Sequence, residues 1–345
     1  MSRRTATASA VAFAALTALV LTGCGTTSVE ASGDDTSSEP VSQSCENDST
    51  TTSTDPVTLT DDLGRTVELD KPAERVAVLE WQQTEDLLSL CVTPVAVADA
   101  EGYSTWDTAE KLPEGVADVG TRQEPSLDAI FGEDPDLVIV EVSSPDDEIV
   151  SQLEAYDVPV LATVGADAAE PIQHMKDTFS LIAEATGRSE RAGVVLDEFD
   201  TALAEAKDAV ADADLETMDF VYFDGWAQGG NVAIRPFGQG SLFGELGEEL
   251  GLTNVWSGEV DPVYGLGQTD VEGLVEVGDA MLIYTGTDDP ESDSVVDLLA
   301  DNDIWASLPA VERGDVYAFP SGIWTFGGPR SAEQAIDAYV DLLTA

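Results

Sequence analysis

The sequence predicts an α/β protein of two lobes joined by a long helix, and three observations lead to this prediction. Short apolar segments ending in Gly, Asp or aromatic residues alternate with helical patterns, as β-α units do. These segments fall into two groups, with a purely helical stretch between them. A weak internal repeat links the groups: Pro125–Ile130 precedes Pro135–Ile139 much as Thr269–Leu274 precedes Gly278–Ile283. Each copy has a polar cap, a helical turn and a buried strand, although repeated β-α units alone can produce this pattern.

Residues 1–23 are predicted to be an export signal. Arg3 and Arg4 precede an apolar run, Ala10–Leu21, that is too short to remain as a membrane span. The following Leu21-Thr22-Gly23-Cys24 resembles the bacterial lipobox, which implies cleavage before Cys24 and acylation of that cysteine; a stray cysteine is the alternative. We therefore expect an extracytoplasmic protein, anchored to the outer face of the cell membrane as a lipoprotein.

Residues 24–55 are predicted to be the lipidated cysteine followed by a disordered tether, because Ser, Thr, Asp and Gly dominate and almost nothing can be buried. Two further cysteines, Cys45 and Cys91, remain for an oxidising compartment. A disulfide between them and two unpaired thiols are both open, because the sequence does not fix their separation in space.

The folded part divides at the helical stretch. The N-terminal α/β lobe is expected over residues 56–170, with strands at Val76–Leu79, Val95–Ala98, Leu137–Val140 and Val160–Thr163. A helical segment over 171–213 holds one helix at 171–186 and the interlobe helix at 190–211. One face of the latter carries Val195, Leu196, Phe199, Leu203, Ala206 and Val210. The C-terminal lobe, 214–345, has strands at Phe220–Phe223, Ala280–Tyr284 and Val316–Phe319.

The charge of the chain excludes nucleic acid as a partner. It carries 68 Asp and Glu against 14 Lys and Arg, a formal net charge of −54, and phosphate binding needs clustered cations. Because apolar residues still make up 43% of the chain, a core can form under this anionic surface. We interpret the excess of acids as an adaptation to a salty medium; an ordinary acidic secreted protein is the alternative.

The sequence offers little for catalysis or metal binding. The single histidine, His174, lies in a helical pattern where a solvated or capped side chain is expected. Without a second histidine or a pair of free cysteines, a zinc site is excluded. Gly240–Gly244 misses the spacing of a nucleophile elbow, and no phosphate-binding loop occurs. We predict a binding protein that is not an enzyme and has no cofactor.

Aromatic residues and the rare arginines mark a candidate ligand site. Open α/β sheets present ligand sites beyond the carboxyl ends of their strands. Aromatic side chains recur at such positions: Trp81, Tyr103, Trp106, Trp226, Trp324 and Phe326. A core role is the alternative for each of them. Arg122 precedes the helix before Leu137–Val140, where it can pair with an anionic ligand oxygen or with a neighbouring acid. Arg235 is a weaker candidate on the same grounds.

An ordered set of segments resembles the ferric-hydroxamate siderophore-binding proteins of ABC importers. In the first lobe these segments are Arg75–Trp81, Val97–Asp99 with Tyr103 and Trp106, and Asp118–Leu127. In the second lobe they are Phe237-Gly238 with Ser241–Phe243, Tyr264-Gly265, Ile304-Trp305 with Leu308–Val311, and Ile323–Gly327 with Ser331-Ala332. The resemblance covers residues 57–342.

The resemblance implies two Rossmann-like lobes, each with a central mainly parallel sheet, bridged by a rigid α-helix, with the ligand cleft between them. It assigns Arg122 to the hydroxamate oxygens that coordinate iron, and Trp81, Trp106, Tyr264, Trp324 and Phe326 to an aromatic cleft. One departure is clear: the family's hydroxamate binder has a ligand-contacting tyrosine after the strand that ends here at Val140, whereas Glu141–Pro145 of this chain contains none, so a related chelate remains open.

The function implied is capture of a ferric siderophore, expected to be of the hydroxamate type, by a monomer that delivers it to an ABC permease and its ATPase. Asp128 and Glu272 match the acidic residues that dock such proteins on the permease, although a plain helix-start role is open for both. Alternatives are a binder of cobalamin, haem or a catecholate siderophore, a secreted hydrolase, and an adhesion module.

Overall fold

The computed structural model describes residues 45–144, 147–213, 215–287 and 294–344, all within the compact unit Glu39–Ala345. The predicted export signal, Cys24 and the first part of the predicted tether lie outside the described residues. Within these ranges, no helix is both long enough and apolar enough to cross a bilayer.

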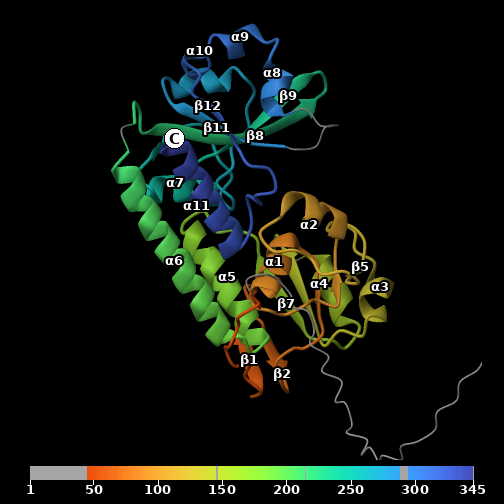
Figure 1. The fold of residues 1–345 in the computed structure, drawn as a ribbon. Helices are drawn as coiled ribbons and strands as arrows, with labels where there is room; N and C mark the ends of the chain where they lie inside the picture. Colours follow the sequence, from red (N-terminus) through yellow and green to blue (C-terminus); the bar gives the residue numbers. More distant parts are fainter. Residues whose placement is uncertain (1–44, 145–146, 214, 288–293, 345) are drawn as a thin grey trace, which may run out of the picture. The chain divides into compact units, whose positions relative to one another are not determined.

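The N-terminal lobe contains a parallel sheet in the order β5-β4-β3-β6-β7 (Figure 1). Its strands are β3 (Val76–Val78), β4 (Ala96–Val97), β5 (Ala117–Asp118), β6 (Leu137–Val142) and β7 (Val160–Val164). The helices between them are α1 (Trp81–Ser89), α2 (Ala100–Trp106), α3 (Leu127–Gly132) and α4 (Glu148–Glu154). Helices cover both faces of the sheet, which explains why its central strands are continuous apolar runs.

The C-terminal lobe repeats this architecture with one antiparallel addition. Its sheet runs β10-β8-β11-β12, and β9 pairs with β8 in the antiparallel sense. The strands are β8 (Asp219–Gln228), β9 (Asn231–Phe237), β10 (Thr253–Asn254), β11 (Met281–Thr285) and β12 (Val316–Phe319). The helices are α7 (Leu242–Glu249), η2 (Gly273–Val277), α8 (Val295–Leu299), α9 (Asp303–Ala306), α10 (Pro309–Arg313) and α11 (Pro329–Leu343). The helical turn predicted at Thr269–Leu274 is a 3₁₀ helix that starts later, at Gly273.

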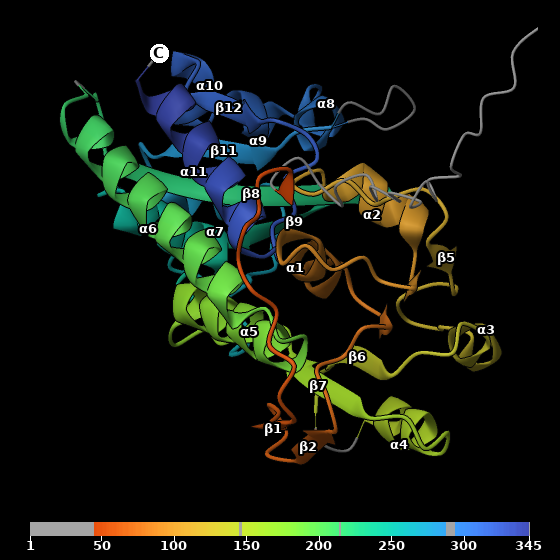
Figure 2. The same cartoon turned by 60° about the horizontal axis from the view of Figure 1, so that its bottom comes forward.

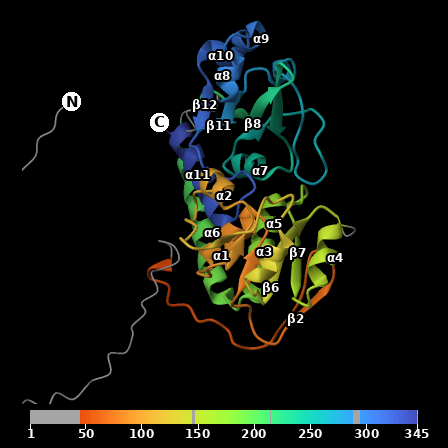
Figure 3. The ribbon, with the colours of Figure 1, turned by 90° about the vertical axis from the view of Figure 1, so that its right-hand side faces the viewer.

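Two helices connect the lobes, α5 (Pro171–Ala185) and α6 (Ser189–Ala211). The buried face of α6 is shared between two cores: Val195 packs in the core of the first lobe, while Phe199 and Val210 pack in that of the second. Because one continuous helix is buried in both lobes, it fixes their spacing. The C-terminal helix α11 lies alongside α6 (Figure 2), and α2 lies where the two lobes meet (Figure 3).

Residues 45–55 differ from the predicted tether, because specific contacts hold them on the first lobe. Cys45 and Cys91 form a disulfide with an S–S distance of 2.03 Å. Asp48 forms an ion pair with Arg188 at the start of α6, and the Thr51 backbone N–H donates to Glu190 at 3.0 Å. Polar groups of this segment therefore bind residues that are distant in the sequence. A hairpin of β1 (Val57–Thr60) and β2 (Thr66–Leu69) follows.

Candidate functional site

The candidate site is a cleft of about 260 Å³ between the lobes, at the carboxyl ends of the strands. It is lined by Trp81, Trp106, Arg122, Asp224, Arg235, Thr285, Ile323, Trp324 and Thr325. Trp81 begins α1 directly after β3, Thr285 ends β11, and Trp324 lies in the loop between β12 and α11. Parallel strands bring such positions to one edge, so both sheets present their ligand-facing edges to the same space.

Arg122 is held in the cleft by a carboxylate and an aromatic ring. Its Nη1 donates to Oε1 of Glu80, and its guanidinium carbon lies 3.7 Å from the centroid of the Trp81 ring. Glu80 is the N-cap of α1 and also accepts from the Trp81 N–H at 2.8 Å. The Nε of Arg122 has no partner among the described residues. Arg122 therefore forms an ion pair with a neighbouring acid, which was one of its two predicted roles. This pair orients the guanidinium within the cleft, and not all of its N–H donors are used.

Arg235 lines the same cleft from the second lobe. It lies on β9 directly opposite Asp224 of β8, and its Nε donates to Oδ1 of that residue at 2.9 Å while Nη2 donates to Oδ2. Its guanidinium carbon is 5.4 Å from the centroid of Phe326. Burial raises the pKa of Asp224, and Arg235 opposes this shift. Each lobe thus contributes one arginine and one paired carboxylate.

A continuous row of aromatic rings runs between the two arginines. Trp81 from the first lobe meets Trp324 from the second edge-on, with ring centroids 4.7 Å apart. Trp324 in turn contacts Phe326 at 5.3 Å, and Phe326 contacts Tyr264 at 5.6 Å. Trp106 stands at the edge of the cleft with 40% of its surface exposed. Of the aromatic residues predicted from sequence, Trp81, Tyr264, Trp324 and Phe326 form this row, and the Trp81–Trp324 contact joins the lobes. Trp226 lies outside the row, with its ring centroid 5.7 Å from the Arg235 guanidinium carbon.

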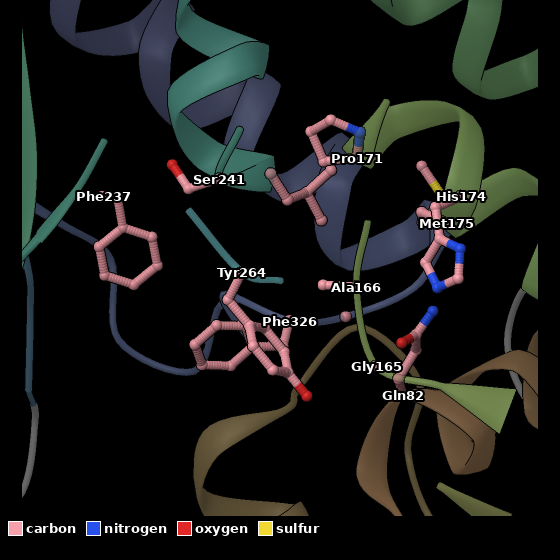
Figure 4. Close-up of a pocket in the computed structure, with 12 residues that line it drawn as sticks. Gln82, Gly165, Ala166, Pro171, His174, Met175, Phe237, Ser241, Tyr264 and Phe326 are labelled. Atoms are coloured by element: carbon pink, nitrogen blue, oxygen red, sulfur yellow. The ribbon is translucent and has the colours of Figure 1, made fainter. Parts of the chain in front are cut away.

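A second, smaller crevice adjoins this row, with a volume of about 20 Å³. Figure 4 shows Tyr264 and Phe326 side by side in it, with His174 and Gln82 opposite. His174 Nε2 lies 2.8 Å from the carbonyl oxygen of Val164, so its ring is fixed by the backbone. The Tyr264 hydroxyl crosses the crevice and donates to Oε1 of Glu141 at 2.9 Å.

One predicted ligand residue, Tyr103, does not line the cleft. Tyr103 is fully buried beneath Trp81 and Leu88, and its hydroxyl donates to the Glu110 carbonyl at 2.7 Å. It supports Trp81 from behind because α2 turns that side chain toward the core. The predicted docking residues, Asp128 in the first turn of α3 and Glu272 just before η2, are both exposed.

Sequence reasoning missed the carboxylates of the site, Glu80, Asp224 and Glu141. In so acidic a chain, the residue type alone carries no signal. For Asp224 a signal existed, since a two-residue turn between β8 and β9 places it opposite Arg235. In the described ranges, no group of three or more His, Cys, Asp or Glu side chains is arranged to hold a metal ion.

The two α/β lobes meet at a cleft that is lined by aromatic rings and by two arginines, each paired with a carboxylate. This arrangement is that of a two-lobed binding protein. Comparison with known families agrees: the model for periplasmic binding proteins matches residues 76–322. The chain belongs to this family. As a member it is a binding protein and not an enzyme, as predicted.

Named relatives extend over most of the chain. The iron(3+)-hydroxamate-binding protein FhuD of Escherichia coli is 24% identical over 264 residues, covering 75% of this chain and 83% of the relative. The Fe(3+)-citrate-binding protein YfmC of Bacillus subtilis is 29% identical over 282 residues, covering 79% and 81%. The crystal structure of the siderophore-binding protein FhuD from Vibrio cholerae, bound to Fe³⁺-Desferal, matches with a TM-score of 0.66 and 22% identity, over 79% of this chain and 98% of that one. This last similarity concerns the fold.

Proposed function

We propose that this protein is an extracytoplasmic lipoprotein, anchored through Cys24, that captures a ferric siderophore of the hydroxamate type and delivers it to an ABC importer. Its relatives support the class of ligand, since those named above bind ferric hydroxamate, ferric citrate or Fe³⁺-Desferal. They do not agree on the chemistry of the chelator, so the choice among chelates rests on the cleft itself.

The observation that carries the proposal is the combination of an aromatic row with arginines in one cleft. A siderophore surrounds its iron with its own oxygen atoms, so a carrier needs no metal ligands. It needs instead apolar walls for the carbon framework and a few donors for the outward-facing oxygens. Trp81, Trp106 and Trp324 supply the walls, extended by Phe326 and Tyr264. Arg122 supplies the donor, with Arg235 facing it from the second lobe.

The charge balance of the cleft supports a hydroxamate over a catecholate or a citrate. Arg122 is paired with Glu80 and Arg235 with Asp224, so each positive charge is already offset by a carboxylate. A tris-catecholate or citrate complex of iron is strongly anionic and would meet these carboxylates with like charge. A ferric trihydroxamate is neutral or carries a positive arm, so no such repulsion opposes its binding.

Delivery would use Asp128 and Glu272, which are exposed at corresponding places on the two lobes. Paired acids on a carrier can meet arginines on a permease at long range, because opposite charges steer the encounter. Replacing both residues by alanine would then reduce uptake while leaving chelate affinity unchanged. Equal uptake by the double variant and the parent would remove these two residues from the docking surface.

Tryptophan fluorescence tests the substrate. The mature protein is titrated with a ferric trihydroxamate, its iron-free form, a ferric tris-catecholate, ferric citrate, cobalamin and haem. We expect the ferric trihydroxamate to quench at micromolar or lower concentration, because the Trp81–Trp324 pair lies in the cleft, and the anionic chelates to bind at least about tenfold more weakly. Quenching by a catecholate alone would refute the hydroxamate assignment, and no response to any iron chelate would refute the siderophore proposal.

A further inference from the structure

Glu141, near the end of β6, contacts Tyr264 of the crevice, and within the described residues it forms no ion pair. Its Oε1 accepts from the Tyr264 hydroxyl of the other lobe at 2.9 Å. Its Oε2 lies 3.5 Å from Nε2 of Gln83, which also donates to Thr163 at 2.9 Å. The ion pairs of the cleft, Arg122–Glu80 and Arg235–Asp224, do not include it. Neutral donors therefore hold this carboxylate in place.

The groups around Glu141 shift the pKa of its carboxyl group. Burial is the main cause that raises its pKa to about 7, and the neighbouring carboxylate of Glu80 adds to the effect. Hydrogen bonds from Tyr264 and Gln83 and the charge of Arg122 act in the opposite direction. Asp261 is a further acid near the Tyr264 ring. Since each arginine of the cleft is paired with a carboxylate, ionised Glu141 adds a negative charge that no ion pair among the described residues offsets.

A glycine beside Glu141 allows the two lobes to approach each other closely. Gly165 follows β7, and a Cβ atom there would lie 2.1 Å from the Tyr264 hydroxyl and 2.4 Å from Oε1 of Glu141. No larger residue fits while this hydrogen bond exists. Figure 4 shows Gly165 beside the crevice that Tyr264 enters. Glu141 keeps part of its surface exposed, and its partner Tyr264 lines the crevice.

We propose that Glu141 is a specificity-determining residue, whose carboxylate favours ferric chelates with a positively charged arm, such as a primary ammonium group, over neutral chelates with the same iron coordination. This inference rests on the proposed function. A partly buried carboxylate with only neutral partners is strongly stabilised by an ammonium ion, because the low local dielectric strengthens the attraction. An ammonium group bound beside Glu141 would add a third positive charge to those of Arg122 and Arg235.

A pair of matched ligands isolates this effect. Ferric desferrioxamine B carries a pendant ammonium group, and its N-acetyl derivative has the same hydroxamates without that charge. Both are titrated against the mature protein, Glu141→Gln and Glu68→Gln. The last variant removes an exposed acid of β2 and controls for the general attraction of a cation to so acidic a protein. We expect the wild type and Glu68→Gln to bind the ammonium form about tenfold more tightly, and Glu141→Gln to bind the two forms within about twofold of each other.

The pH dependence gives a second readout that needs no variant. Between about pH 6 and about pH 8 Glu141 loses its proton while the ammonium group stays charged. The preference of the wild type for the ammonium form should therefore grow as the pH rises, through tighter binding of that form alone. Equal affinities for the two forms at both pH values would overturn the inference and leave the proposed function intact. So would an equal loss of both affinities in Glu141→Gln. Failure of both chelates to bind the wild type would instead overturn the proposed function.

Discussion

We predict that Glu85 of α1 contributes strongly to the stability of the junction between the lobes. Its side chain is fully buried and reaches the start of α11 in the other lobe. Oε1 accepts from the N–H groups of Arg330 at 3.0 Å and Ser331 at 2.9 Å. Oε2 accepts from the Gly328 N–H at 3.0 Å and the Ser331 hydroxyl at 2.6 Å. No side chain from its own end caps α11, so Glu85 performs that role from a distance.

The substitution Glu85→Gln should lower the free energy of unfolding by about 2–4 kcal/mol. Glutamine keeps one acceptor oxygen, so two of the four hydrogen bonds are lost and two donors face an amide NH₂ group. A hydrogen bond to a charged group is worth about 1.5–3 kcal/mol. Relief from burying a carboxylate, which raises the pKa of Glu85, offsets part of the loss. For a chain of this size the melting temperature should fall by about 3–6 °C.

Thermal and urea unfolding, followed by circular dichroism, measure this change. The matched control is Glu74→Gln, which removes an exposed carboxylate paired with Lys71 and should change stability by less than about 0.5 kcal/mol. If Glu85→Gln unfolds within about 1 °C of the parent, the capping of α11 by the other lobe contributes nothing, and the reasoning fails.

Four further predictions follow from the described contacts. Arg122→Ala should weaken binding of a ferric trihydroxamate by about 1.5–3 kcal/mol in calorimetry, and an unchanged affinity would place the donor elsewhere. Asp86→Asn should stabilise the protein at neutral pH by about 1 kcal/mol or more. Burial, and then the charge of Glu85, hold the Asp86 pKa well above its usual value, and neither carboxyl oxygen has a hydrogen-bond partner in the described part of the chain. The contribution of Asp86 to stability is therefore fully present below its unfolded pKa and is lost as the pH rises, so the advantage of Asp86→Asn should grow with pH; an advantage greatest in acid would contradict this. The melting temperature should rise between about 0.1 M and about 1 M salt, as the repulsion among 68 acids is screened, and a flat response would argue against the salty-medium interpretation. The double variant Cys45→Ser, Cys91→Ser should lose up to about 4 kcal/mol in urea unfolding, because the bond closes a loop with a sequence separation of 46 residues, and full retained stability would contradict this.

The pattern of apolar residues was sufficient to predict the strands that lie in the centre of each sheet. β3, β6, β11 and the first part of β8, Phe220–Phe223, are short, largely buried apolar runs, and such runs stand out in a polar chain. The edge strand β9 was missed because Pro236 interrupts it, and proline in an apolar run argues against a strand unless the strand lies at an edge.

The contacts that build the cleft were less accessible to sequence reasoning. Tyr264 and Glu141 are 123 residues apart, and no local pattern reports such a contact. Tyr103 was misplaced because a short helix does not reveal which way each of its residues points. The same limit applies to residues 45–55, whose composition is that of a tether but whose Asp48 meets Arg188 140 residues away.

Acidity had two opposite effects on what could be predicted. It made arginines informative, and Arg122 and Arg235 both line the cleft. It also concealed the carboxylates that matter, because Glu80, Glu85 and Glu141 look like any other acids of the chain. Only burial and hydrogen-bond partners separate these residues from the solvated majority.

Uptake of radioactive iron by cells of the source organism tests the central claim most directly. A strain lacking this protein is compared with the same strain carrying the parent or Arg122→Ala, with iron supplied as a ferric trihydroxamate. We predict that uptake is lost in the deletion strain, restored by the parent and restored poorly by Arg122→Ala. Undiminished uptake in the deletion strain, together with no binding of the chelate by the purified protein, would contradict the claim.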